Sequence, residues 1–364
     1  MKVGILGGGQ LARMIALSGI PLGQNFIVLD PATDAGAVRL SEHLHGDYDD
    51  PKLLQQLAEK ADVVTYEFEN VPAQVADYLT DHTRIFPPAQ ALSVAQDRLT
   101  EKNFFHQLEI KTAPFAPVDS LQDLEKGVAK VGFPAILKSR RMGYDGKGQV
   151  VLQSEQDLAD AWHSMQNAPS IVEGFVPFQR EVSIIAVRNQ HGEIRFYPLS
   201  ENSHKGGILR VAQCCHDDAE QKQAEKYVSR LLEALNYVGI IALELFDVDG
   251  ELLANEFAPR VHNSGHWTIE GAETSQFENH LRAILDLPLG STAARGFSAM
   301  VNFIGDMPAE DKILAIDHAH LHLYDKSPRK GRKIAHATIR CDEQQQFEQS
   351  LQQLTELAKQ FDNS

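Results

Sequence analysis

The chain begins with the stretch Lys2-Val-Gly-Ile-Leu-Gly-Gly-Gly-Gln-Leu-Ala12, an apolar run followed by a glycine turn and the start of a helical pattern. Residues 2–6 predict a buried strand and residues 10–18 a helix. The turn has the spacing G-x-G-x-x-A, and Asp30 lies 23 residues beyond Gly7. Glycines let the backbone approach an anion, and the helix start offers N–H donors. The turn therefore predicts a dinucleotide such as NAD on Gly7, Gly9 and Asp30, another anion, or a turn without a ligand.

The alternation of strands and helices continues outward from this stretch. Residues 26–30 and 63–66 predict further strands, and residues 51–60 predict a helix between them. Such alternation is typical of a parallel, doubly wound α/β sheet. A Pro-Pro pair then interrupts the pattern. We therefore expect a Rossmann-like N-terminal domain at residues 1–95.

The rest of the chain has an α+β pattern. Helices are predicted at residues 89–108, 121–131, 154–165, 219–235 and 343–361, and strands at residues 135–138, 149–152, 170–173, 180–187, 239–247 and 251–258, with short strands within 297–343. A chain of 364 residues is long enough for two or three domains. We expect a central domain at 96–296, with a flap or lid subdomain at about 112–180, and a small β-rich C-terminal domain at 297–364.

The charge balance excludes several classes of protein. Lys plus Arg number 34 and Asp plus Glu number 50, which gives a formal charge of −16. Such a chain has no general attraction for nucleic acid or an anionic membrane, so neither partner is expected. The three cysteines are a poor disulfide framework, the N-terminus lacks the pattern of a signal peptide, and no apolar run reaches the about 18 residues of a membrane span. A cytoplasmic protein that binds anions in local pockets is expected.

Two motifs point to a nucleotide. Lys138 ends an apolar strand, and three glycines follow within residues 143–148. Such a loop can fold its N–H groups over phosphates, and a buried ammonium needs an anionic partner; an ordinary hairpin is the alternative. Residues 173–176 (Glu-Gly-Phe-Val) resemble a hinge whose backbone reads an adenine edge.

Glu244 and Glu256 lie in two apolar segments joined near residues 249–250. A charge in an apolar strand is costly unless it is paired or bound to a metal. With a three-residue loop, Ala242 would face Glu256 and the two carboxylates would be diagonal neighbours on one face. A two-residue loop would put them on opposite faces. The first register predicts a Mg²⁺ site beside nucleotide phosphates, and two solvent-facing glutamates are the alternative.

Two further segments are rich in polar groups. Arg260 could hold a planar oxyanion, and His262 and His266 are four residues apart without the helix pattern of a zinc site, so zinc is not expected. Five of the eight residues at 326–333 are basic. They predict a phosphate pocket for a small substrate, or a solvated loop.

Together these motifs resemble the ATP-grasp superfamily, and most closely its N5-carboxyaminoimidazole ribonucleotide synthetase family. The most specific match is the run Ala258-Pro-Arg-Val-His-Asn-Ser-Gly-His-Trp-Thr268; residues 7–13, 143–149, 324–326 and 331–333 also match, and the similarity runs from Met1 to about residue 340. Ala258 replaces the Asn of many ATP-grasp enzymes, as it does in the resembled family. Met142 stands where that family commonly has glycine.

The resemblance implies a Rossmann-like pre-ATP-grasp domain, a central ATP-grasp domain and a role for each matching residue. It implies ATP contacts at Arg98, Lys138, Gly143, Tyr144, Asp145, Gly146, Lys147, Gly148, Gln149, Glu173, Val176, Glu181, His204, Asn255 and Glu256. It implies two Mg²⁺ ions on Glu244 and Glu256, and ribonucleotide contacts at Gln10, Leu11, Glu67, Lys326, Arg332 and Lys333. It implies catalytic contacts at Lys138, Tyr144, Asp145, Arg260 and His262, and a homodimer.

The implied activity is that of an ATP-dependent carbon–nitrogen ligase of purine biosynthesis. Bicarbonate and ATP would form carboxyphosphate, and the amine of 5-aminoimidazole ribonucleotide would then take the carboxyl group. Formate-dependent glycinamide ribonucleotide transformylation is the alternative within the superfamily. An NAD-dependent oxidoreductase and a non-enzymatic ATP-binding regulator are the alternatives from other classes.

Overall fold

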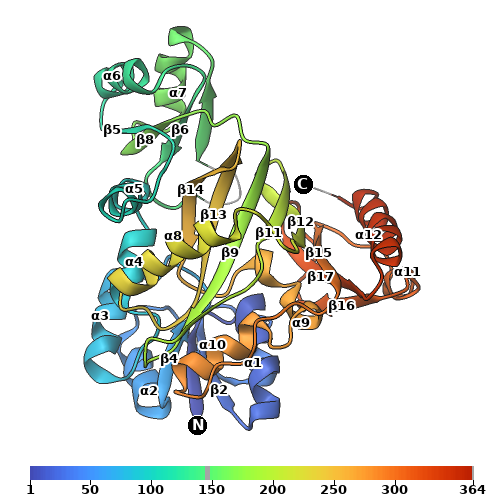
Figure 1. Ribbon diagram of the computed structural model, residues 1–364. Coiled ribbons are helices and arrows are strands. Elements are labelled where there is room, and N and C mark those ends of the chain that lie inside the picture. Colours follow the sequence, from blue (N-terminus) through green and yellow to red (C-terminus); the bar gives the residue numbers. More distant parts are fainter. Residues whose placement is uncertain (144–147, 363–364) are drawn as a thin grey trace.

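The structure is a computed structural model that describes residues 1–143 and 148–362. Figure 1 shows the N-terminal region at the bottom, a lid at the top, a large sheet between them and the C-terminal helix at the right. The predicted site residues Tyr144, Asp145, Gly146 and Lys147 lie outside the described residues. No helix within the described ranges is long and apolar enough to cross a membrane.

The N-terminal region is the predicted Rossmann-like unit. Its parallel sheet has the order β3-β2-β1-β4. Nearly all residues of β1 and β2 are buried and most of them are apolar, as expected for strands covered on both faces. The elements are β1 (Lys2–Leu6), α1 (Gln10–Gly19), η1 (Ile20–Leu22), β2 (Asn25–Asp30), η2 (Val38–Leu40), β3 (Glu42–His45), α2 (Pro51–Lys60), β4 (Val63–Tyr66) and α3 (Ala73–His82).

Two helices, α4 (Ala89–Ala95) and α5 (Arg98–Gln107), connect this region to the lid. A single helix at residues 89–108 was predicted, and that prediction is wrong. The Asp97 side chain accepts hydrogen bonds from the backbone N–H groups of Leu99 and Thr100, at 3.0 and 3.2 Å. Asp97 is therefore the N-cap of a second helix, a position that aspartate favours.

The lid has an antiparallel sheet of its own, in the order β5-β8-β6-β7. Helices α6 and α7 cover this sheet, and Leu124, Leu137, Trp162 and Val172 lie in the core between them. The elements are β5 (Phe115–Val118), α6 (Leu121–Val131), β6 (Ala135–Ser139), β7 (Gln149–Leu152), η3 (Glu155–Asp157), α7 (Leu158–Ser164) and β8 (Ser170–Gly174).

The large sheet has the order β14-β13-β9-β11-β12-β15-β17-β16, with β10 beside β9. Its elements and their covering helices are β9 (Arg180–Arg188), β10 (Ile194–Phe196), β11 (Ser200–Lys205), β12 (Ile208–Cys214), α8 (Gln221–Ala234), β13 (Gly239–Val248), β14 (Glu251–Ala258), η4 (Asn263–Gly265), α9 (Thr268–Gly271), α10 (Gln276–Ile284), β15 (Phe297–Ile304), α11 (Glu310–Leu314), β16 (Ala319–Leu323), β17 (Lys333–Cys341) and α12 (Gln344–Lys359).

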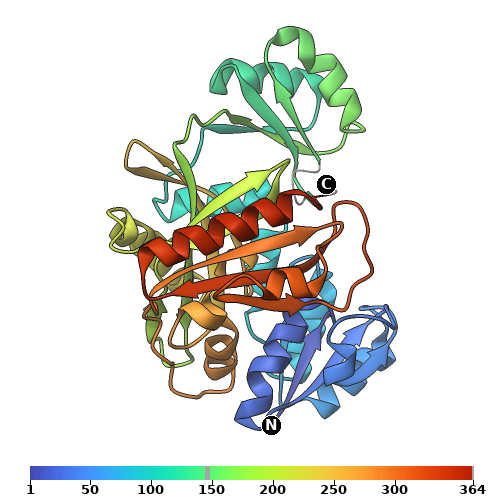
Figure 2. The same ribbon diagram turned by 90° about the vertical axis from the view of Figure 1, so that its right-hand side faces the viewer.

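The predicted β-rich C-terminal domain is present, and its strands continue the central sheet. Val211 of β12 pairs with Val301 of β15, and β15 pairs along its length with β17. Helix α12 lies across these strands (Figure 2), and its Phe347 and Leu354 are buried in their core. The central and C-terminal domains therefore share one sheet.

The hairpin that carries Glu244 and Glu256 differs from the predicted register. Val248 pairs with Glu251, so the loop has two residues, and Ala242 pairs with Ala258. A two-residue loop alone would separate the carboxylates onto opposite faces. A β-bulge between Glu244 and Leu245 shifts the register so that Glu244 lies directly opposite Glu256. The carboxylates share one face, but as direct rather than diagonal neighbours.

Candidate active site

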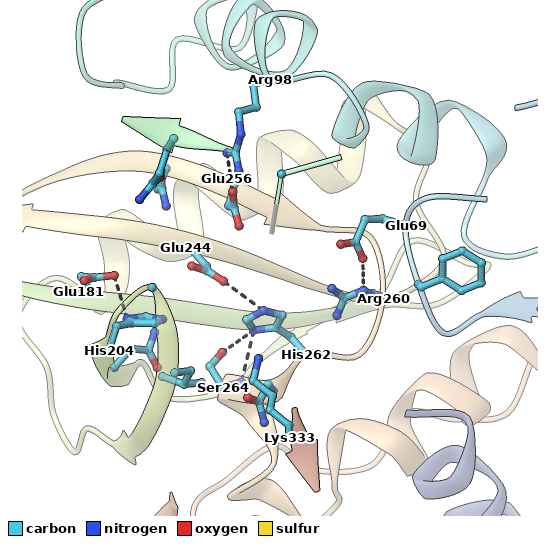
Figure 3. A pocket seen from close by; sticks show the side chains of 18 of the residues that line it. Glu69, Arg98, Glu181, His204, Glu244, Glu256, Arg260, His262, Ser264 and Lys333 are labelled. Carbon is cyan, nitrogen blue, oxygen red and sulfur yellow. Dashed lines mark hydrogen bonds and ion pairs between the residues drawn. The ribbon is translucent and has the colours of Figure 1, made fainter. Parts of the chain in front are cut away.

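A cavity of about 610 Å³ lies where the N-terminal region, the lid and the large sheet meet (Figure 3). Each of these regions contributes side chains to its wall. The predicted site residues that line it are Gln10, Leu11, Glu67, Arg98, Lys138, Gly143, Gln149, Glu181, His204, Glu244, Asn255, Glu256, Arg260, His262 and Lys333. Residues that are far apart in the sequence thus converge on one space.

The other described site residues lie beside this wall or behind it. Lys326 donates a hydrogen bond to Gln10 Oε1, so it adjoins the lining. Arg332 donates to Ser327 Oγ at 3.2 Å. Gly148 O accepts from the backbone N–H of Ser139 at 2.8 Å. Glu173 and Val176 are buried.

The two predicted metal carboxylates each have a basic partner. Arg98 donates to Glu256 at 2.7 Å, and His262 Nε2 lies 3.1 Å from Glu244 (Figure 3). His262 Nδ1 faces the backbone N–H and the hydroxyl of Ser264, at 3.3 and 2.8 Å, so its other ring nitrogen, Nε2, is directed at Glu244. Burial raises the pKa of Glu244, but the His262 hydrogen bond and charge outweigh it and bring that pKa to about 2. Glu244 is therefore ionised at neutral pH.

The residues at this pair fit a hard cation. Asn255, next to Glu256 on β14, has a buried Oδ1 without a hydrogen-bond partner among the described residues. Within the same residues, no group of three or more His, Cys, Asp or Glu side chains is arranged to hold a metal alone. Two carboxylates with an amide oxygen suit Mg²⁺, which usually takes its other ligands from water and nucleotide phosphates.

Lys138 is held by the buried carboxylate of Glu173, a residue that the sequence analysis placed at the adenine. Its Nζ donates to Glu173 Oε2 at 2.9 Å, and Lys102 Nζ lies 3.6 Å from the same oxygen. Burial raises the pKa of Glu173, but the charges of Lys102 and Lys138 outweigh it and bring the pKa to about 2. The Glu173 side chain thus fixes Lys138, and only its backbone is left to read an adenine edge.

His204 and Glu181 face each other at the far end of the cavity, with His204 Nδ1 3.0 Å from Glu181 Oε2. Burial lowers the pKa of His204, but the nearby Glu181 carboxylate has the larger combined effect, and the net shift is upward.

In the lid, Met142 has a φ of 62°, in the left-handed region that favours glycine. The glycine that the resembled family commonly has there suits this backbone.

Arg260 has a partner that the sequence did not reveal. Its Nε donates to Glu69, and its Nη1 donates to the carbonyl oxygen of Val261 at 3.1 Å. Burial raises the pKa of Glu69, but the Arg260 charge and hydrogen bond outweigh it and lower that pKa. Glu69 follows Glu67 by two residues within a polar segment, so no spacing rule distinguishes it. Lys102 was missed for a similar reason, because a lysine on a polar helix is usually solvated.

The glycine turn binds carboxylates of the chain itself. Gly8 N–H donates to Asp30 at 2.7 Å, and Gly9 N–H and Ala12 N–H donate to Glu67 at 2.6 and 3.1 Å. The pKa of Glu67 is raised, because burial outweighs these bonds. Asp30 also accepts from Tyr48, so it is not poised for a ribose. These contacts argue against the NAD alternative.

Three family profiles match successive parts of the chain. The ribonucleotide synthetase pre-ATP-grasp domain matches residues 1–96, the ATP-grasp domain residues 103–277, and the phosphoribosylaminoimidazole carboxylase C-terminal domain residues 298–350. The order is the one expected from the sequence.

Relatives match over nearly the whole length. The N5-carboxyaminoimidazole ribonucleotide synthase of Pseudomonas aeruginosa is 54% identical, over 94% of this chain and 95% of its own. The crystal structure of N5-carboxyaminoimidazole ribonucleotide synthetase from Thermus thermophilus superposes with a TM-score of 0.94 at 53% identity, covering 98% of both chains. An Aspergillus clavatus synthase in complex with ADP and 5-aminoimidazole ribonucleotide has a TM-score of 0.92 at 31% identity, covering 99% of this chain and 98% of its own. The chain therefore belongs to the N5-carboxyaminoimidazole ribonucleotide synthase family.

Proposed function

We propose that this protein is an ATP-dependent carbon–nitrogen ligase that carboxylates 5-aminoimidazole ribonucleotide to N5-carboxyaminoimidazole ribonucleotide in purine biosynthesis. The observation that carries the proposal is the shared cavity. It joins the Glu244 and Glu256 carboxylates and Lys138 to a second group of side chains, which includes Arg260, His262 and Lys333. ATP at one end and a ribonucleotide at the other would thus react in one shared cavity.

ATP occupies the end of the cavity between the lid and β14. Arg98 and Lys138 line the cavity and are the proposed contacts to its phosphates, and Gly143 and Gln149 of the flap line the same cavity. A second set holds adenine, ribose and the outer nucleotide site: Glu173 through its backbone, Val176, Glu181, His204 and Asn255. Arg98 is paired with Glu256, so the guanidinium is already oriented toward the phosphate end.

Mg²⁺ fits the carboxylate pair and would neutralise charge on the nucleotide phosphates when bound there. Glu244 and Glu256 are the proposed ligands for two ions, and Asn255 Oδ1 is available beside them. His262 and Arg98 hold the two carboxylates in place through the contacts described above.

The ribonucleotide occupies the other end. Gln10 and Leu11 at the start of α1 line this end together with Glu67. Lys326, Arg332 and Lys333 take its 5′-phosphate, and the contact of Lys326 with Gln10 brings the basic segment to the helix start. Lys333 lines the cavity itself.

The chemistry has two steps, both dominated by positioning and charge neutralisation. An oxygen of bicarbonate attacks the γ-phosphorus of ATP, ADP leaves, and carboxyphosphate forms. The exocyclic amine of the ribonucleotide then attacks the carboxyl carbon, its proton is lost, and phosphate leaves. Arg260 and His262, with Tyr144 and Asp145 from the flap, are the proposed contacts to bicarbonate and the amine, and closure over the bound substrates would exclude water from carboxyphosphate.

The test measures ADP release with ATP, Mg²⁺ and bicarbonate, with and without 5-aminoimidazole ribonucleotide. The expected result is turnover that needs both bicarbonate and the ribonucleotide. No stimulation by the ribonucleotide would refute the proposal. Formate with glycinamide ribonucleotide in place of these substrates tests the alternative within the superfamily.

A homodimer is proposed on the family resemblance, and a cytoplasmic location on the cysteine content and the N-terminal pattern of the sequence. Sedimentation equilibrium of the full chain tests the first, and fractionation of the source cells tests the second. A monomer in sedimentation would contradict the dimer.

A further inference from the structure

The alignment of the two proposed metal carboxylates depends on one extra residue. Leu245 pairs with Ala254 and Glu244 with Glu256, so Asn255 has no partner of its own on β13. Without this bulge, Glu244 would face Asn255, and the side chain of Glu256 would point to the other face of the sheet. Whatever holds the bulge therefore sets the distance between the two carboxylates.

Helix α5 supplies the groups that hold it. Strand β14 is the last strand of the large sheet in the described part of the chain, and at its outer edge the Ala254 N–H donates to the carbonyl oxygen of Lys111 at 2.7 Å. Lys102 Nζ donates to the carbonyl oxygens of Ala254 and Asn255, at 3.3 and 2.8 Å. Glu101 accepts from the backbone N–H of Phe257 at 2.7 Å. Two adjacent side chains thus bond the backbone on both sides of Glu256.

These contacts are costly to build, which argues that they do more than cover an edge. Glu101 is 2% exposed and Lys102 is 1% exposed, and charged side chains are rarely buried to this degree unless they are paired. An edge strand can be covered at lower cost by apolar or neutral side chains. Lys102 is also the second ammonium beside Glu173, which holds Lys138. One buried lysine therefore contacts both the metal hairpin and the carboxylate of the lid that orients the phosphate lysine.

We propose that Glu101 and Lys102 are positioning residues that fix the β-bulge at Asn255 and so hold Glu244 and Glu256 at the spacing a divalent cation needs. This inference rests on the proposed metal site of the ATP-dependent reaction. It assigns a role to two residues that are not among those lining the 610 Å³ cavity. Loss of one partner around a metal site commonly lowers metal affinity about 10- to 100-fold.

The experiment compares substitutions of similar volume in the full chain. Lys102→Met removes the ammonium and keeps the length of the side chain. Glu101→Leu removes the acceptor for the Phe257 N–H, whereas Glu101→Gln keeps one. Lys111→Met is the matched control, because the Lys111 side chain pairs with Glu251 at the start of β14, and the substitution keeps the Lys111 carbonyl oxygen that accepts from the Ala254 N–H at 2.7 Å.

The readouts are Mn²⁺ affinity by electron paramagnetic resonance at saturating ADP, and ADP affinity by calorimetry with Mg²⁺ and with EDTA. Lys102→Met and Glu101→Leu are expected to weaken Mn²⁺ binding at least tenfold and to reduce the gain in ADP affinity that Mg²⁺ gives. Glu101→Gln and Lys111→Met are expected to match the wild type. A role limited to stability would lower the melting temperature and leave this metal-dependent gain unchanged.

Folded Lys102→Met and Glu101→Leu with wild-type Mn²⁺ affinity would overturn the inference. If Lys102→Met does not fold, the Mn²⁺ affinities of Glu101→Leu and Glu101→Gln are compared instead. Equal affinities in these two variants would overturn the inference. A wild type whose ADP affinity does not respond to Mg²⁺ overturns both the metal site and this inference. If Mg²⁺ raises ADP affinity as expected but the ribonucleotide does not stimulate turnover, the proposed function is refuted. The inference about the bulge then remains supported.

Discussion

Replacing Glu173 by Gln tests the buried charge cluster behind the nucleotide site. The substitution keeps the shape of the side chain and removes its charge. In the wild type this carboxylate lies 2.9 Å from Lys138 Nζ and 3.6 Å from Lys102 Nζ, and all three side chains are buried. In Glu173→Gln both ammonium groups lose a buried counter-charge, and breaking a buried ion pair in this way is strongly destabilising.

The structure gives the size and the sign of this effect. The pKa of Glu173 is about 2, against an ordinary value of 4.5. That difference corresponds to about 3 kcal/mol of unfolding free energy at pH 7. Because the folded-state pKa is lowered, this contribution is present above the ordinary pKa and is lost as the pH falls through about 4.5 toward 2. Glu173→Gln should therefore lose about 3 kcal/mol at pH 7, and the difference from wild type should shrink below about pH 4.

The assay is urea unfolding followed by circular dichroism at several pH values. Glu125→Gln is the control, because Glu125 is exposed on α6 of the same lid. It should change the unfolding free energy by less than about 0.5 kcal/mol at every pH. If Glu173→Gln is no less stable than Glu125→Gln at pH 7, the Lys102–Glu173–Lys138 cluster does not stabilise the fold and the reasoning fails.

Three further predictions concern the cavity wall. Lys138→Ala should lower ADP affinity about 10- to 100-fold in calorimetry, the range for losing a hydrogen bond to a charged group, whereas exposed Lys126→Ala should not; equal affinities would count against the phosphate site. His204→Asn should flatten the pH profile of unfolding, because the stability from a raised histidine pKa is present below the ordinary value and lost as the pH rises through the raised one; a profile parallel to wild type contradicts the ion pair. Arg260→Lys should raise the KM for bicarbonate roughly tenfold with ADP affinity unchanged, since lysine keeps the charge but loses the planar fork; an unchanged KM refutes an oxyanion role.

The local parts of the fold were predictable from sequence, and the parts set by distant contacts were not. The Rossmann-like alternation follows from short apolar runs and a glycine turn, which act within a few residues. The hairpin of Glu244 and Glu256 was predicted with the wrong loop. Its bulge depends on bonds from Glu101 and Lys102, some 150 residues earlier in the chain, and no hairpin rule contains such bonds.

The site shows the same division. Arg260, His262 and Lys138 were found because their motifs are dense and lie at strand ends. Glu69 and Lys102 were missed because their roles arise only when separate regions meet. The shared sheet of the central and C-terminal domains was also invisible, since the pairing of β12 with β15 joins segments about 90 residues apart.

The continuous sheet has a consequence for how this chain can be divided. A chain cut after residue 296 would leave β12 with a bare row of N–H and C=O groups, and such an edge recruits strands from other molecules. The C-terminal strands thus protect the enzyme from aggregation through the edge of β12. They are not a separable domain that can be deleted. The lid closes its hydrogen bonds within its own sheet. The lid is therefore the part of the molecule that can move as a rigid body against the large sheet without breaking the hydrogen bonds between any two paired strands.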